Sequence, residues 1–447
     1  MPEEVPVGPA PGDVAFGHVP DWMDSTFFEK SLRAGLEDPG LRVTGNDVRA
    51  ATGKGENYVS IVYAARVTTV KKDGERDGKD EEEHHLIIKC LPSNKARRLM
   101  SNNAEFFRKE VDMYEMVFPE YKRLAIGRGV TLPWPRHYST LLDGEGDYLV
   151  MDDLRVAGYV MTDRLAGLDP AHLGAALRAL AKFHAFSYAL QLKEPEVFRT
   201  KVYDRFPETM FAYKSEEMMD MFIKQAYGDT ADAIREWGEP KHEMIADWMH
   251  AVKGTSVRQI IELLSPDDPG AVLNHGDFWV NNMLFRYPSG EGAREPADVR
   301  LLDFQIARVC SPAADLSYLL ATSITKVVRE AHWEALLQNA YHDTFWETLE
   351  ALGAKEIAKA RSSELFTWPW LQSEMRRFLP FALCTSVTTA TVVLAESSDA
   401  PDMDTMTEDQ LLGKDLNNPF AHLVKAKLYQ ERLRGLLDFF LEQGVFQ

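Results

Sequence analysis

Two short polar motifs lie close together in the second half of this 447-residue sequence. The segment NHGDFWVNNMLF contains His275, Asp277 and Asn282 as H-x-D-x-x-x-x-N, and VRLLDFQ contributes Asp303. Phosphoryl transfer needs a carboxylate to accept the proton of the attacking hydroxyl, and oxygen ligands to hold Mg²⁺ against phosphates. We interpret Asp277 as the catalytic base and Asn282 and Asp303 as metal ligands. His275 is the second catalytic candidate, as a residue that orients the loop by hydrogen bonding.

These groups must be positioned by short strands. After Gly158 helical patterns dominate, and apolar runs predict three strands near 271–274, 283–286 and 299–304. Asp277 alone could cap a turn, and Asn282 alone could satisfy backbone groups. Their order, with Asp303 on a following strand, favours a catalytic loop followed by a metal-binding strand end.

The N-terminal half has a different pattern. Residues 41–91 are strand-like, with glycines that indicate a hairpin, and the charged segment 71–84 is interpreted as a solvated surface loop. A helix is expected at about 102–118, and strands at 136–142 and 148–154.

The predicted organisation is α+β and bilobal. A disordered arm (1–20) precedes an amphipathic helix that begins near Asp21. A small, mainly antiparallel β lobe with one helix (21–155) is followed by a large, mainly helical lobe (156–447).

The composition excludes several classes of partner. The net charge is −19 and the pI about 5.1, so nucleic acid and anionic membranes are not expected as partners. The three cysteines form no metal-ligand spacing and do not suggest a disulfide framework. The first residues lack the apolar region of a signal peptide, and 381–395 is too short to span a bilayer. A cytoplasmic setting is therefore expected.

Several phrases together resemble one family. GKGENYVSIVYAARV, LIIKCLP, FFRKEVDMYEMVFP, YLVMDDL, GLDPAHLGAALRALAKFHAFS, VLNHGDFWVNNMLF and LLDFQIARVCSPAADLSYLL occur in this order over about residues 50–325. The chain resembles the protein-kinase-like phosphotransferases of small molecules, such as choline kinases and aminoglycoside phosphotransferases. Within that group it is most similar to the ecdysteroid kinase-like (CHK-kinase-like) family. The resemblance implies a protein-kinase-like fold and the cofactors ATP and Mg²⁺.

The same resemblance implies an ATP site in the N-terminal lobe. Lys89 would contact the α/β-phosphates and pair with Glu110, since either charge is costly to bury alone. A snorkelling lysine and an exposed helix carboxylate are the structural alternatives. Gly53 and Gly55 would let a turn approach the triphosphate, although a plain β-turn would look the same.

Other positions have implied or structural roles. Backbone groups of Asp152, Asp153 and Leu154 would bond the adenine edge, where side chains need not matter. Asp315 matches an aspartate that braces the catalytic loop. His184 lies on an apolar helix face and is interpreted as a satisfied core group.

The acceptor is expected to be a small alcohol. Only eleven residues separate Asp303 from Asp315, which leaves no room for a peptide-binding activation segment, so a polypeptide substrate is not expected. The resemblance implies an ecdysteroid hydroxyl or a xenobiotic alcohol. Phe278, Trp279 and the segment TWPWLQSEMRRFLPF offer aromatic groups for a pocket, although core packing explains Trp368 and Trp370 equally well. A choline- or ethanolamine-type kinase and a catalytically silent pseudokinase remain the alternatives.

Overall fold

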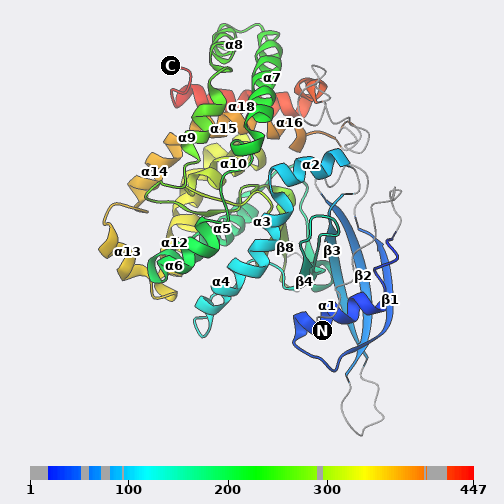
Figure 1. Cartoon of the computed structure of the whole chain (residues 1–447). Coiled ribbons are helices and arrows are strands. Elements are labelled where there is room, and N and C mark those ends of the chain that lie inside the picture. Colours follow the sequence, from blue (N-terminus) through cyan, green and yellow to red (C-terminus); the bar gives the residue numbers. More distant parts are fainter. Residues whose placement is uncertain are drawn as a thin grey trace.

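The structure is a computed structural model, and it describes residues 19–51, 60–71, 81–92, 95–288, 295–396, 399 and 420–447. Most of the expected N-terminal arm (1–18) and both glycines of the expected phosphate turn, Gly53 and Gly55, lie outside these residues. A sheet with its helices lies beside a larger helical body (Figure 1). The expected α+β, bilobal architecture, with an antiparallel β part and a mainly helical part, is confirmed.

Five strands and several helices make up the N-terminal part. Their bounds are α1 (Ser25–Leu36), β1 (Arg42–Ala50), β2 (Ile61–Val70), β3 (Glu81–Cys90), α2 (Lys95–Asn103), α3 (Phe106–Asp112), the π-helical turn η1 (Met113–Val117), α4 (Phe118–Ala125), β4 (His137–Leu141) and β5 (Tyr148–Asp152). The strands form one antiparallel sheet in the order β1-β2-β3-β5-β4. Leu86 and Ile88 alternate with less buried residues along β3 and point into the core.

Helix α1 covers one face of this sheet. It packs against β1 and β4, and Phe28 and Leu32 on its apolar face are completely buried. The helix begins at Ser25 rather than near Asp21, because the side chain of Asp24 accepts a hydrogen bond from Phe27 N and caps the helix there.

Two predictions in this part were wrong in detail. The single helix expected at 102–118 is interrupted at Glu105, whose φ of 56° is left-handed, so α2 ends before it and α3 begins after it. The described N-terminal part therefore has more than one helix. The charged loop expected at 71–84 is shorter, because Glu81–His84 extend β3 by pairing with β2, and buried His84 bonds Thr69 at 2.9 Å.

The C-terminal part is mainly helical. Its first elements are the 3₁₀ turn η2 (Leu154–Ala157), β6 (Tyr159–Val160), α5 (Pro170–Lys193), α6 (Pro195–Phe198), η3 (Arg199–Tyr203), η4 (Tyr213–Ser215), α7 (Glu216–Arg235), α8 (Pro240–Val252), α9 (Ser256–Leu263), β7 (Val272–Asn274), η5 (Val280–Asn282), β8 (Met283–Arg286), β9 (Asp298–Leu301) and β10 (Arg308–Cys310). The remaining elements are α10 (Ala313–Ser323), α11 (Lys326–Leu336), η6 (Leu337–His342), α12 (Asp343–Ala351), α13 (Lys355–Arg361), α14 (Trp368–Arg377), α15 (Leu379–Val387), α16 (Thr389–Val393), η7 (Ala421–Lys425) and α18 (Lys427–Glu442).

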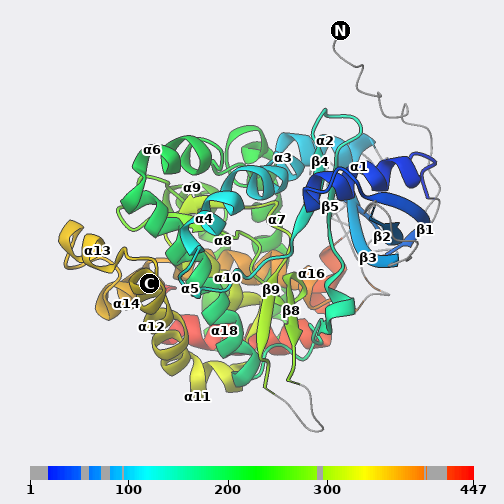
Figure 2. The same ribbon diagram turned by 90° about the horizontal axis from the view of Figure 1, so that it is seen from below.

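Helix α5 is the central element of this part. It is buried on nearly all sides and contacts α12, β7 and β9, and the carboxylate of Asp169 caps its N-terminus at His172 N. Figure 2 shows β8 and β9 beside α5, between the helices and the N-terminal sheet. This central position fixes the short strands that carry the polar motifs.

The short strands differ partly from the prediction. Strands β7 and β8 match it, but β9 ends at Leu301, so Asp303 follows the strand rather than ending it. Likewise, β5 ends at Asp152 instead of residue 154. The sequence pattern also missed β6 and β10, which are two and three residues long and show no resolvable alternation.

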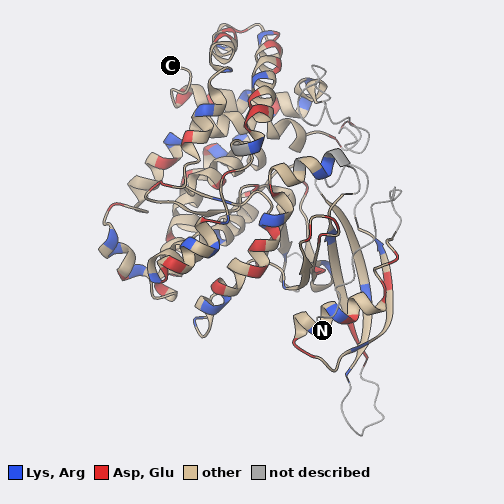
Figure 3. Cartoon of the chain, in the orientation of Figure 1, with Lys and Arg blue, Asp and Glu red and all other residues tan. Residues whose placement is uncertain are grey.

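Positively and negatively charged residues are mixed along the described helices (Figure 3). Figure 3 shows Lys and Arg interspersed with Asp and Glu along the helices in this view. Among the helices of the described residues, none combines the length and apolar character needed to cross a membrane.

Candidate active site

The loop after β7 turns sharply at Gly276. Its φ is +87°, and a Cβ atom there would lie 2.0 Å from the backbone oxygen of Ile306. Any side chain would therefore collide with backbone as well as adopt a left-handed conformation. This glycine therefore allows a sharp turn between His275 and Asp277.

Three side chains donate hydrogen bonds to the carboxylate of Asp277. Its Oδ1 accepts from Tyr318 OH at 2.6 Å, and its Oδ2 accepts from Asn282 Nδ2 at 2.8 Å and from Trp279 Nε1 at 3.3 Å. Burial raises the pKa of Asp277, and the Tyr318 hydrogen bond opposes that rise. The structure thus places the predicted base and one predicted metal ligand in direct contact.

Lys89, Glu110 and Asp303 meet between the sheet and the helical body. Lys89 Nζ lies 2.6 Å from Glu110 Oε2 and 2.7 Å from Asp303 Oδ1. The Lys89–Glu110 ion pair predicted from the sequence is confirmed as a contact. Burial disfavours the charged lysine, but the two carboxylates more than offset it, so the pKa of Lys89 is raised and the side chain stays cationic.

Asn282 and Asp303 offer oxygen atoms for a metal. Asn282 uses its Nδ2 for Asp277, and its Oδ1 accepts no hydrogen bond from any residue that the structure describes. The Asn282 backbone oxygen accepts from Leu302 N at 2.9 Å, which brings Asn282 beside the chain leading into Asp303. A carboxylate and an amide oxygen fit Mg²⁺ better than zinc, and the described chain has no group of three or more His, Cys, Asp or Glu arranged for a metal.

Asp315 braces the loop, as the resemblance implied. Its Oδ2 accepts from His275 N at 2.6 Å, and its Oδ1 accepts from Gly276 N at 2.8 Å. The His275 ring is hydrogen-bonded to Leu302 O at 2.8 Å, which ties the loop to the end of β9. His275 thus has the contacts of an orienting residue.

His184 is a satisfied core histidine, as predicted. Its Nε2 donates to Asp315 at 3.1 Å, and its Nδ1 accepts from Tyr341 OH at 2.7 Å. Burial lowers the pKa of His184, so the neutral ring fills both roles. Burial alone would raise the pKa of Asp315, but the hydrogen bond from His184 and that from Gly276 keep it below its usual value.

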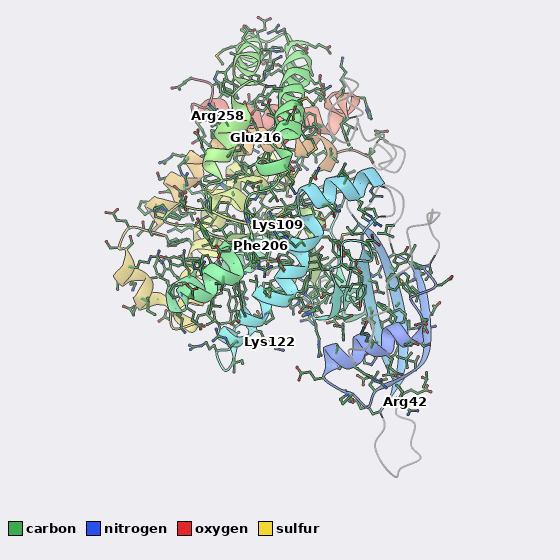
Figure 4. The ribbon with its side chains drawn as sticks, viewed as in Figure 1. Arg42, Lys109, Lys122, Phe206, Glu216 and Arg258 are labelled. Atoms are coloured by element: carbon green, nitrogen blue, oxygen red, sulfur yellow. The ribbon has the colours of Figure 1, made fainter. Side chains whose placement is uncertain are left out.

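A buried charged cluster behind the loop was missed by the sequence interpretation. Arg308 donates from Nη1 to Glu208 Oε2 at 2.5 Å and from Nη2 to Gly276 O at 3.0 Å. Next to Glu208, Pro207 O accepts from Lys109 Nζ at 2.6 Å, and burial lowers the pKa of Lys109 to about 7. Figure 4 shows Lys109 and Phe206 together in the centre of the molecule. The segment around Glu208 therefore links α3, which carries Glu110, to the loop that contains His275 and Asp277.

The expected adenine-binding segment is only partly available. The backbone N–H of Asp152 donates to Arg136 O, and that of Asp153 donates to His85 O, each at 2.9 Å. The side chains are also engaged, because Asp152 accepts from Tyr138 OH and Asp153 accepts from Arg155. The backbone groups expected to contact adenine are therefore limited to those of Leu154 and to the backbone carbonyl groups of this segment.

The aromatic residues considered for an acceptor pocket do not all lie near Asp277. Trp279 is half-buried and bonds Asp277, whereas Phe278 is fully buried. Trp368 lines a cavity of about 450 Å³ with His342 and Trp346, away from the residues bonded to Asp277.

The rings of Trp370 and Phe366 pack at an angle of 47°, with centroids 4.8 Å apart, and Trp370 also packs over Gly270. Core packing therefore accounts for Trp370. Of this aromatic set, only Trp279 is bonded to Asp277 within the described residues.

Comparisons with known proteins give one family and several distant structures. The model of the ecdysteroid kinase-like family matches residues 54–354. Among curated proteins no significant match is found. Choline kinase from Cryptosporidium parvum is similar at 10% identity, with 94% of this chain and 98% of that chain covered and a TM-score of 0.39.

Two aminoglycoside phosphotransferases are also similar. The enzyme from Alicyclobacillus acidocaldarius is 16% identical over 77% of this chain and 92% of its own, with a TM-score of 0.33. The enzyme from Streptomyces rimosus, in complex with ADP and streptomycin, is 17% identical over 79% and 99%, with a TM-score of 0.25. All three TM-scores lie below 0.5, so the similarity of this chain to these structures is distant.

Proposed function

This chain belongs to the ecdysteroid kinase-like family, and from that premise and its site geometry we propose that it is an ATP- and Mg²⁺-dependent kinase of a small-molecule hydroxyl. The observation that carries the proposal is the convergence of Lys89, Glu110 and Asp303 within 2.7 Å contacts, next to a loop that joins Asp277 to Asn282. A pseudokinase would be expected to have lost one of these groups.

Each residue has a proposed task. Asp277 accepts the proton of the acceptor hydroxyl while the oxygen of that hydroxyl bonds to the γ-phosphorus of ATP and the bond from this phosphorus to the leaving ADP oxygen breaks. Lys89 contacts the α/β-phosphates of ATP, and Glu110 keeps Lys89 in place. Asn282 Oδ1 and the Asp303 carboxylate would hold Mg²⁺, which neutralises phosphate charge when bound. Leu154 offers backbone groups to the adenine edge, and residues 21–155 and 156–447 form the proposed nucleotide and acceptor lobes.

The proposed acceptor is an ecdysteroid or a xenobiotic alcohol. Family membership supports this class, and the half-buried indole of Trp279 beside Asp277 suits an apolar ring next to the reacting hydroxyl. A polypeptide acceptor is disfavoured because the segment between Asp303 and Asp315 is short, and Arg308–Cys310 within it pair with β7 as a strand.

The test is a phosphoryl-transfer screen with Mg·ATP. Steroid, phenolic, glycosidic and amino-alcohol acceptors are incubated with the full chain, and products are detected by mass. Phosphorylation of a steroid or xenobiotic alcohol by the wild type, and phosphorylation at least about 100-fold slower by Asp277→Asn, is expected. If choline is the only acceptor that is phosphorylated, the proposed acceptor class is wrong and the choline-kinase alternative is supported. If nucleotide binding does not depend on Mg²⁺ and no acceptor is phosphorylated, the proposed kinase activity is rejected and the protein is a nucleotide-binding protein without this activity.

A further inference from the structure

Tyr318 is the residue at the site that neither the sequence motifs nor the proposed function accounts for. It lies on α10, three positions after Asp315, and residues at this spacing share one face of a helix. Helix α10 therefore carries both Asp315, which accepts hydrogen bonds from the loop backbone, and Tyr318, whose hydroxyl donates to the carboxylate of Asp277. The Tyr318 side chain is 8% exposed, and its hydroxyl donates to Asp277 Oδ1 at 2.6 Å.

The hydrogen bonds of Asp277 leave little room for an acceptor. A carboxylate has about four lone-pair positions, two on each oxygen. On Oδ2, both are used, by Asn282 and by Trp279. On Oδ1, Tyr318 uses one, and no other described residue donates to this oxygen. The remaining position on Asp277 is on Oδ1, adjacent to the phenol.

We propose that Tyr318 is a positioning residue for phosphoryl transfer, which fixes Asp277 so that the acceptor hydroxyl docks on the remaining lone pair of Oδ1, beside the phenol. This inference rests on the proposed function. Tyr318 fixes the rotation of the carboxylate and, by occupying one side of Oδ1, sets the direction from which the acceptor approaches. Asn282 and Trp279 hold the other oxygen, so that the carboxylate cannot turn away.

A purely structural role makes a different prediction. A phenol that only satisfied a buried carboxylate would affect stability and would lower activity equally whether or not residue 277 could act as a base. A positioning role acts through Asp277 and must disappear when Asp277 is replaced. The two roles can therefore be separated by a double-mutant cycle.

The experiment compares Tyr318→Phe with Tyr341→Phe, in the wild type and in Asp277→Asn. Tyr341 is the matched control, because its buried hydroxyl bonds His184 instead of the catalytic carboxylate. The measured quantities are kcat and KM for an acceptor identified in the screen, Mg·ATP affinity and Tm. Tyr318→Phe is expected to lower kcat/KM for the acceptor by about 10- to 100-fold, with Mg·ATP affinity unchanged. In the Asp277→Asn background it should have no further effect.

Three results would overturn the inference while leaving the proposed function intact. One is that Tyr318→Phe keeps the wild-type kcat/KM, and another is that Tyr318→Phe causes an equal loss of kcat/KM with and without Asp277→Asn. The third is an activity loss in Tyr341→Phe as large as that in Tyr318→Phe, because removal of a hydroxyl that does not contact Asp277 would then have the same effect. If the wild type phosphorylates no acceptor, the proposed function fails, and the inference fails with it.

Discussion

Arg308 donates a hydrogen bond to the carbonyl oxygen of Gly276 at 3.0 Å, so a fully buried guanidinium supports the backbone of the loop that carries Asp277. The same side chain pairs with Glu208, whose carboxylate also accepts from the backbone N–H groups of Met210 and Phe211. This arrangement makes the loop dependent on a charged pair that is costly to bury unless it is complete.

The buried pair leads to a prediction about stability. Arg308→Met should lower the free energy of unfolding by roughly 3–5 kcal/mol, because it leaves Glu208 charged and unpaired. Adding Glu208→Gln should restore part of the loss, since Gln keeps an acceptor for Met210 and Phe211 without a charge. Denaturant unfolding measures both. Arg199→Met, which breaks an exposed pair with Glu196, is the control and should leave stability unchanged. A double variant no more stable than Arg308→Met would contradict the pairing argument.

Gly276→Ala should strongly destabilise the loop. The left-handed backbone alone costs about 1–2 kcal/mol for a residue with a Cβ, and the collision with Ile306 O adds to that cost. Gly238→Ala is the matched control, because Gly238 also has a positive φ (70°) but nothing lies within 4 Å of its Cβ position. Thermal unfolding should show a clearly larger loss for Gly276→Ala, and equal losses would remove the steric argument.

The buried His184 should make stability depend on pH. Burial lowers its folded pKa below the usual 6.5, so on acidification the unfolded chain takes up a proton that the folded chain does not. The free energy of unfolding should therefore fall as pH decreases below about 6.5. Urea unfolding between about pH 7.5 and 5.5 should give a shallower dependence for His184→Gln, whereas exposed His332→Gln should keep the wild-type slope. An unchanged slope in His184→Gln would refute the assignment.

Asp277→Asn tests the proposed base. It should lower kcat by about 10²–10⁴ while Mg·ATP affinity stays nearly intact, because Asp277 is bonded to Asn282, Trp279 and Tyr318 and makes no contact with Lys89. Steady-state kinetics with an identified acceptor and equilibrium nucleotide binding measure the two effects. A large loss of nucleotide affinity with little change in kcat would assign Asp277 to binding.

Asp303→Ala tests the proposed metal ligand. It should abolish the dependence of nucleotide binding on Mg²⁺, while Lys89 keeps its contact with Glu110 at 2.6 Å. Titration of ATP with and without Mg²⁺ measures this directly. Asp298→Ala is a suitable control, because Asp298 lies on β9 but bonds Tyr159 and Arg300 away from the loop. Persistent Mg²⁺ dependence in Asp303→Ala would exclude the role.

The sequence by itself determined the kinds of groups present and their order. The spacing of His275, Asp277 and Asn282, and the short strands around them, were readable because apolar runs predict short strands. The Lys89–Glu110 pair was also predictable, since two charges in apolar elements must find partners.

Only the tertiary structure decided which residues support this site. Tyr318 meets Asp277 across 41 positions of the chain, and Arg308 meets Glu208 across 100. Such contacts depend on how α10, β10 and the segment before α7 pack, and periodicity within one element carries no information about that packing. Likewise, local patterns could not show that the N–H groups of Asp152 and Asp153 are used within the protein, because their acceptors come from other strands and loops. Residue types follow from the sequence, whereas the geometry that makes them a site follows from the packing of distant elements.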